Sequence, residues 1–135
     1  MRRSPIVEIR TMIRGSLPRI PYERIAREIF GRTPPAGRDA YQLSLVICGD
    51  SLAKKMNREY RHKSYAANVL SFPISKNEGE IFLNVRKAER ETRQFGISVR
   101  KHMTRLFVHG CLHLKGLEHG ARMDALEKKI LASRF

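Results

Sequence analysis

The segment from His109 to His119, HGCLHLKGLEH, restricts the fold of this chain more than any other feature of its sequence. His109 and His113 are four residues apart, which on a helix places both imidazoles on one face, one turn apart. Gly116 can end that helix in a left-handed conformation and reverse the chain, which brings His119 back towards the same point. The segment therefore predicts a long helix whose last turn, together with the turn after it, gathers three imidazoles.

Three imidazoles that leave one coordination position open are typical of a catalytic zinc site, in which the metal acidifies a bound water. We therefore expect one Zn²⁺ ion on His109, His113 and His119, although three imidazoles also accept nickel, copper or iron. Cys111 lies about 200° round the helix from either helical histidine, so we expect it to face the core. His102 lies about 10 Å along the helix axis from His109 and is expected to be a solvated surface side chain.

The same histidine spacing occurs in the zinc-peptidase motif HExxHxxGxxH, where a Glu directly after the first histidine acts as general base. Here that position is Gly110, which has no side chain, so the ligand spacing is kept and the proteolytic base is missing. Glu118 could replace that base, but we expect it to orient a histidine or to face solvent. The sequence therefore disfavours a peptidase.

The chain is strongly basic: its 135 residues include 27 Lys and Arg against 13 Asp and Glu, a formal net charge of +14. Such an excess favours an anionic partner, and nucleic acid supplies phosphates that bind without any sequence code. The alternative is that the charge only keeps the protein soluble. No apolar run approaches the ~18 residues of a membrane span, and no secretory signal is visible. Two cysteines without a CxxC pattern indicate a reducing cytoplasm.

The length predicts one domain over residues 1–135, and the hydrophobic pattern predicts short strands separated by amphipathic helices. We expect strands at residues 6–9 (an edge strand), 41–48, 69–74 and 80–85. We expect helices that open near Pro21, begin at an Asp50 N-cap, end at Gly96, run from a Ser98 cap to about Gly116, and begin near Met123. A turn at residues 76–79 joins two of the strands. This order indicates an α+β fold with a small mixed sheet of about four strands packed with helices.

With these motifs in place, the sequence resembles the YbeY family of bacterial endoribonucleases and rRNA maturation factors. The family signature H-G-x-L-H-L-x-G-x-D-H matches residues 109–119 except at Glu118, where the family usually has Asp. A second family block, N-x-x-Y-R followed by T-D-V-L-S-F-P, appears here as Asn57, Tyr60 and Arg61 and then as residues 67–73. A third block, G-D-I, appears as G-E-I at residues 79–81. The blocks span residues 41–135, and the first 40 residues carry little resemblance.

The resemblance implies a zinc ion on the three histidines and metal-dependent cleavage of single-stranded RNA. It also implies a role in rRNA processing and ribosome quality control, with small-subunit ribosomal proteins and an assembly GTPase as partners. Arg61 matches the family's functionally important arginine, and its planar guanidinium suits a phosphodiester because it can bind two non-bridging oxygens. The second block departs from the family at Ala67 and Asn68. Asn68 in place of Asp removes a negative charge and donates as well as accepts hydrogen bonds.

Basic side chains outside the histidine segment are expected to position RNA through its phosphates. The group nearest to Arg61 consists of Lys54, Lys55, Arg58 and Lys63. Tyr60 and Tyr65 are the nearest candidates for stacking on bases, although we expect Tyr60 to pack in the core. The alternative function is a non-catalytic RNA-binding or ribosome-binding assembly factor, in which a further ligand closes a structural zinc site.

Overall fold

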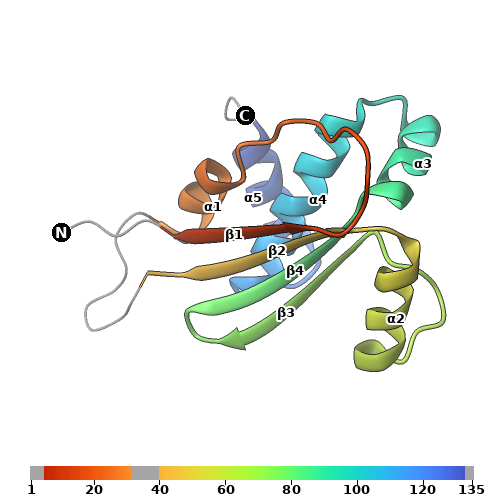
Figure 1. Ribbon diagram of the computed structural model, residues 1–135. Coiled ribbons are helices and arrows are strands. Elements are labelled where there is room, and N and C mark those ends of the chain that lie inside the picture. The colour runs from red at the N-terminus through yellow and green to blue at the C-terminus, as the bar shows by residue number, and fades with distance from the viewer. Residues whose placement is uncertain (1–4, 32–39, 133–135) are drawn as a thin grey trace.

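The computed structural model describes residues 5–31 and 40–132 as a four-stranded sheet with helices packed against it (Figure 1). The strands are β1 (Ile6–Thr11), β2 (Gln42–Cys48), β3 (Val69–Ser75) and β4 (Glu78–Asn84). The helices are α1 (Tyr22–Phe30), α2 (Asp50–Arg61), α3 (Val85–Phe95), α4 (Val99–Leu114) and α5 (Ala121–Leu131). The strand order is β1-β2-β4-β3, in which β1, β2 and β4 are parallel and β3 is antiparallel to β4. The expected α+β fold with a small mixed sheet is confirmed.

The chain connections explain why the sheet is mixed. Parallel strands need a long crossover, and α1 lies in the chain between β1 and β2, as α2 lies between β2 and β4. A short turn at residues 76–77 joins β3 to β4, so this pair is antiparallel. β3 carries Pro73 and is the last strand of the sheet, the position that best tolerates a residue without an N–H group. β1 forms the opposite edge, as the sequence predicts.

β2 is apolar along most of its length because both of its faces are covered. Leu45 and Ile47 pack in a large core that includes side chains of α1, α4 and α5. Val46 and Cys48 point to the other face, where a smaller core includes side chains of α2. α4 crosses the first face, and its Phe107 is fully buried. The two-sided core therefore holds the C-terminal end of α4 at a fixed place beside the sheet.

The helix ends follow the sequence in most places. Ser98 accepts a hydrogen bond of 3.1 Å from a backbone N–H in the first turn of α4, and Gly96 ends α3 with a φ of 65°. The prediction that Asp50 caps α2 is wrong, because Gly49 holds that position and Asp50 is the first helical residue. The Asp50 carboxylate instead contacts the Arg90 guanidinium of α3 at 2.8 Å. Asp50 therefore pairs with a residue of another helix instead of capping the helix that it begins.

The predicted element boundaries differ from the observed ones by a few residues. β1 continues beyond residue 9 to Thr11, and α5 begins at Ala121, two residues before Met123. The expectation for the last helix extends to residues 133–135, which lie outside the described part of the chain. Among the described helices, none has the length and apolar character that a membrane crossing requires.

Candidate metal centre

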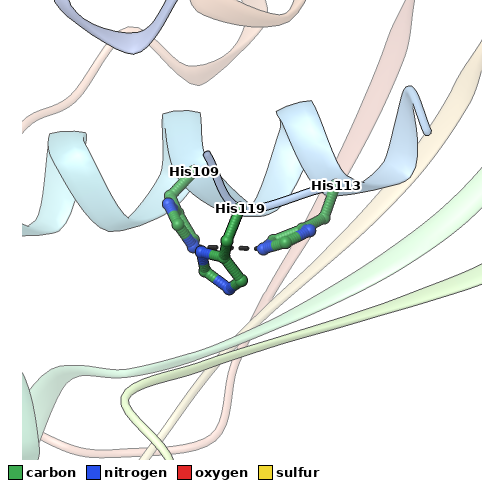
Figure 2. Close-up of side chains that lie close together, drawn as sticks. All are labelled: His109, His113 and His119. Carbon is green, nitrogen blue, oxygen red and sulfur yellow. Dashed lines mark hydrogen bonds between the residues drawn. The ribbon is translucent and has the colours of Figure 1, made fainter. Parts of the chain in front are cut away.

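Three imidazole rings converge at the C-terminal end of α4 (Figure 2). His109 and His113 project from neighbouring turns of the helix, and their Nε2 atoms lie 3.1 Å apart. His119 reaches the same point from the segment after the helix, with its ring centroid 4.9 Å from that of His109 and 4.6 Å from that of His113. One nitrogen from each ring lies within 4.8 Å of the others. The predicted convergence of the three histidines is therefore found.

The backbone after α4 explains how His119 returns. Gly116 has a φ of 98°, in the left-handed region that favours glycine. The Gly116 N–H donates to the His113 carbonyl at 2.9 Å, and the Leu117 N–H donates to the Leu112 carbonyl at 3.1 Å. This pair of bonds is the Schellman motif, which uses the last carbonyls of a helix while the chain turns back. The expected role of Gly116 is confirmed.

The outer nitrogens of the two helical rings are held by oxygen atoms. His109 Nδ1 lies 3.1 Å from Glu127 Oε2 of α5, and His113 Nδ1 lies 3.0 Å from the Leu117 carbonyl. A carboxylate and a carbonyl can only accept, so each Nδ1 carries the proton. In the neutral ring with this tautomer, the two Nε2 atoms that face one another keep their lone pairs, which is the state in which histidine binds a metal ion.

The donor set fits a divalent metal ion. Zinc–nitrogen bonds of about 2.0–2.1 Å around a tetrahedral ion separate the ligand nitrogens by roughly 3.3 Å, close to the observed Nε2 separation. Burial lowers the pKa of His113, and electrostatic interaction with His109 and His119 lowers it further. This direction favours the neutral ring, which is the form that binds a metal ion. The chemistry of three neutral imidazoles permits zinc and the neighbouring transition metals alike.

The histidines line one side of an open pocket of about 770 Å³. Its other walls come from the end of α2, the segment that leads into β3, and α5. Arg61 and Arg105 contribute positive charge to the pocket lining, and Asp124 and Glu127 contribute carboxylates. His119 is exposed to solvent. The site is therefore accessible to a substrate of considerable size.

Gly110 lies where a peptidase would carry its general base, and the structure leaves no room for one. A Cβ at this position would lie 3.0 Å from Ser71 Oγ, 3.2 Å from Ile81 Cδ1 and 3.3 Å from Val69 Cγ2. The Ser71 hydroxyl also donates to the Gly110 carbonyl at 3.0 Å. α4 and β3 approach closely at this residue, so a Glu side chain here would collide with the sheet unless the two elements moved apart.

The structure places Arg61 beside the histidines and leaves the other predicted RNA contacts outside. Arg61 is the last residue of α2 and lines the pocket, and its charge contributes to the lowered pKa of His113. His62, directly after it, ends the helix with a left-handed φ of 58°. The other basic residues predicted to contact RNA are exposed, but they are not part of the pocket lining. They are Lys54, Lys55, Arg58 and Lys63.

Two predictions about single side chains are wrong, and a third is confirmed. His102 is not a surface residue, because it is 1% exposed and its Nε2 lies 2.9 Å from Glu91 Oε1 of α3. Tyr60 does not pack in the core, because it is 62% exposed, and its ring lies tilted against that of Phe72 of β3 with the centroids 5.4 Å apart. In both cases the burial depends on how distant segments cover the helix, which helical periodicity does not reveal. Cys111 faces the core and is fully buried, as expected.

Sequence reasoning missed the acidic side of the pocket. Glu127 holds His109, and Asp124 lines the same wall from one turn earlier on α5. Their spacing of three residues puts both carboxylates on one helix face, which is the one available signal in the sequence. Arg105, one turn before His109 on α4, also lines the pocket, and sequence reasoning gave it no separate role at the site. Glu118, expected to orient a histidine or to face solvent, is exposed.

Comparison with known proteins places these features in a family. The model of the family described as "Endoribonuclease YbeY" matches residues 16–134. A protein named Endoribonuclease YbeY from Solibacter usitatus is 34% identical over 119 residues, covering 85% of this chain and 78% of the relative. The protein of that name from Pseudomonas entomophila is 35% identical over 104 residues, covering 67% of this chain. The chain spans 66% of the length of this Pseudomonas relative.

The fold also matches a solved structure. The solution structure of TM1509 from Thermotoga maritima superposes with a TM-score of 0.62 at 22% identity. The match covers 92% of this chain and 87% of the other, so the likeness extends over nearly the whole fold. Together with the three histidines, the mixed sheet and the family match over residues 16–134, this places the chain in the YbeY endoribonuclease family.

Proposed function

We propose that this protein is a metal-dependent endoribonuclease that cleaves single-stranded RNA, with zinc held by His109, His113 and His119. One observation carries the proposal: three imidazoles that fit a metal ion line an open pocket that also contains the Arg61 guanidinium. A cation beside a metal site suits a phosphodiester, because both the substrate and its transition state are anionic. The names of the relatives and the net charge of +14 support RNA as the substrate.

The accessibility of the site favours catalysis over a purely structural metal. A structural zinc site is closed by four protein ligands, whereas a catalytic site keeps a position open. Within residues 5–31 and 40–132, the group of metal-ligating side chains consists of the three histidines. One of them, His119, is exposed on the wall of the pocket. These features argue against the alternative of an assembly factor whose zinc serves only the fold.

Each side chain around the pocket has a separate task in this proposal. Arg61 binds non-bridging oxygens of the scissile phosphate and neutralises the charge that grows there. Arg105, on the wall formed by α4, supplies a second positive charge for the RNA backbone. Glu127 keeps the proton of His109 on Nδ1 and fixes the orientation of the ring. When bound, a divalent metal supplies Lewis-acid chemistry, which polarises a phosphoryl oxygen and acidifies water.

The cellular role that we propose follows from the family. We infer that the chain acts as one domain in the cytoplasm, on rRNA during ribosome maturation and quality control. Small-subunit ribosomal proteins and an assembly GTPase are the proposed partners. The exposed basic residues outside the pocket, among them Lys54, Lys55, Arg58 and Lys63, would bind RNA phosphates in a salt-dependent manner.

A cleavage assay with matched variants tests the proposal. We expect zinc-loaded protein to cut a single-stranded RNA, and we expect chelation, His113→Ala and Arg61→Ala each to reduce the rate at least a hundredfold. Glu59→Ala is the matched control, because Glu59 lies on the same helix α2, is exposed, and is neither part of the pocket wall nor one of the basic residues assigned to RNA. Equal cleavage by all of these preparations would refute the hydrolase. Unfolding of the chain on zinc removal would instead favour the structural role.

A further inference from the structure

A chain of hydrogen bonds leads from the interior of the protein to the wall of the pocket. It begins at His102 of α4, whose Nε2 lies 2.9 Å from Glu91 Oε1 of α3. The Asn68 side chain continues it, because its Nδ2 donates to Glu91 Oε1 at 3.2 Å and to Oε2 at 3.3 Å. Asn68 lines the pocket, whereas Glu91 is not part of its lining. Three segments far apart in the sequence therefore converge on one pocket residue that is not a metal ligand.

The carboxylate fixes which end of the Asn68 amide faces the pocket. A carboxylate has no proton to donate, so the amide nitrogen must point at Glu91 and the carbonyl oxygen must point away from it. Among the described residues, none makes a hydrogen bond to Asn68 Oδ1. Some polar atoms without a partner are fully buried, but Asn68 Oδ1 is not one of these. The oxygen is therefore not fully buried, and the pocket is the cavity that Asn68 lines.

His102 restricts the movement of this arrangement. Its ring is 1% exposed and lies edge-on to the ring of Phe95, with the centroids 5.5 Å apart. Its hydrogen bond goes to the same Glu91 oxygen that accepts from Asn68. The Glu91 side chain is itself 20% exposed, so water has limited access to compete for its oxygens. The buried pair therefore holds the Asn68 amide in one orientation.

The chemistry of an oriented carbonyl oxygen differs from that of the cations around it. Arg61 and Arg105 suit phosphate oxygens, but a carbonyl oxygen cannot bind a phosphate oxygen because both only accept hydrogen bonds. In a nucleic-acid backbone the group that can donate is the ribose 2′-hydroxyl, which distinguishes RNA from DNA. We propose that Asn68 Oδ1 accepts a hydrogen bond from a substrate 2′-hydroxyl, and that Glu91 and His102 are positioning residues for it. This inference rests on the proposed function, and it explains why the enzyme would prefer RNA to DNA.

The test compares one oligonucleotide sequence in two sugar forms. A single strand built from A and C alone does not self-pair, and its RNA and DNA versions differ only in the 2′-hydroxyl groups. Stopped-flow fluorescence anisotropy with zinc-loaded protein measures affinity before cleavage products accumulate. We expect Asn68→Ala to weaken RNA binding by roughly three- to tenfold, as for one neutral hydrogen bond, and to leave DNA binding unchanged.

Two variants of Glu91 separate positioning from mere packing. Glu91→Gln keeps an oxygen that can accept from both Asn68 and His102, so we expect it to retain the RNA preference. Glu91→Met has a similar length but no oxygen, so we expect part of the preference to be lost. Gln94→Ala is the control, because Gln94 is an exposed residue of α3 outside the pocket. Circular dichroism of each variant checks that the fold is retained.

The outcomes distinguish this inference from the function on which it rests. Equal weakening of RNA and DNA binding by Asn68→Ala would indicate a contact to a base or a change in packing, and would overturn the inference. Unchanged affinity for both strands would overturn it as well. If Glu91→Met behaves like the wild type, the positioning role is wrong. Absence of metal-dependent RNA cleavage by the wild type would instead refute the proposed function, and the inference would fall with it.

Discussion

The contact between Glu127 and His109 gives a quantitative prediction about metal affinity. Glu127 Oε2 lies 3.1 Å from His109 Nδ1, and the two side chains are 17% and 25% exposed, so the bond is partly shielded from water. Outer partners of this kind change metal affinity by about 10- to 100-fold, or about 1.4–2.8 kcal/mol. We expect Glu127→Leu to raise the Kd for zinc by that factor. We expect Glu127→Gln to raise it by less than about tenfold, because its amide oxygen still accepts from Nδ1.

Competition against a chromophoric chelator measures these Kd values, and thermal unfolding with and without zinc provides an independent check. Because zinc binds the native state, its stabilising effect should fall in Glu127→Leu, while the metal-free protein stays folded. Glu118→Gln is the matched control, since Glu118 is exposed beside His119 and no hydrogen bond joins it to the described histidines. A Kd for Glu127→Leu within twofold of the wild-type value would refute the reasoning.

Three further predictions concern the scaffold. Gly79→Ala should lower the free energy of unfolding by about 1 kcal/mol in urea denaturation, because its Cβ would lie 2.5 Å from the Tyr41 hydroxyl and 2.9 Å from the Leu114 methyl groups, side-chain ends that must move to make room; unchanged stability would contradict this. The hydrogen bond from Arg90 lowers the pKa of Asp50 to about 2. Asp50→Asn should therefore destabilise the protein at neutral pH, and this loss of stability should disappear as the pH falls from about 4 to 2. A loss that does not depend on pH would contradict this prediction. Burial raises the pKa of Cys48 to about 11 and holds that of Cys111 well above its usual value, so iodoacetamide at pH 8 should alkylate both thiols only in denaturant, as mass spectrometry would show.

Much of the candidate site could be predicted because its geometry is local. The spacing of His109 and His113 determines their shared face once α4 forms, and Gly116 determines where the chain reverses. Arg61 was identified through the family block rather than through any physical pattern around it. The strands and helices were predicted because apolar residues recur with the period of each element, and β2 shows the continuous apolar run of a strand covered on both faces.

The features that the sequence did not reveal depend on contacts between distant segments. Glu127 is 18 residues from the ring that it orients, and Glu91 is 11 residues from His102, on another helix. Helical periodicity gives the face of a side chain but not what covers that face, so it placed His102 at the surface and Tyr60 in the core. By itself, the sequence determined which groups could hold a metal. Which carboxylate lies beside which histidine depends on how α3, α4 and α5 pack against the sheet. These contacts join residues on different helices, so they exist only when the whole chain is folded.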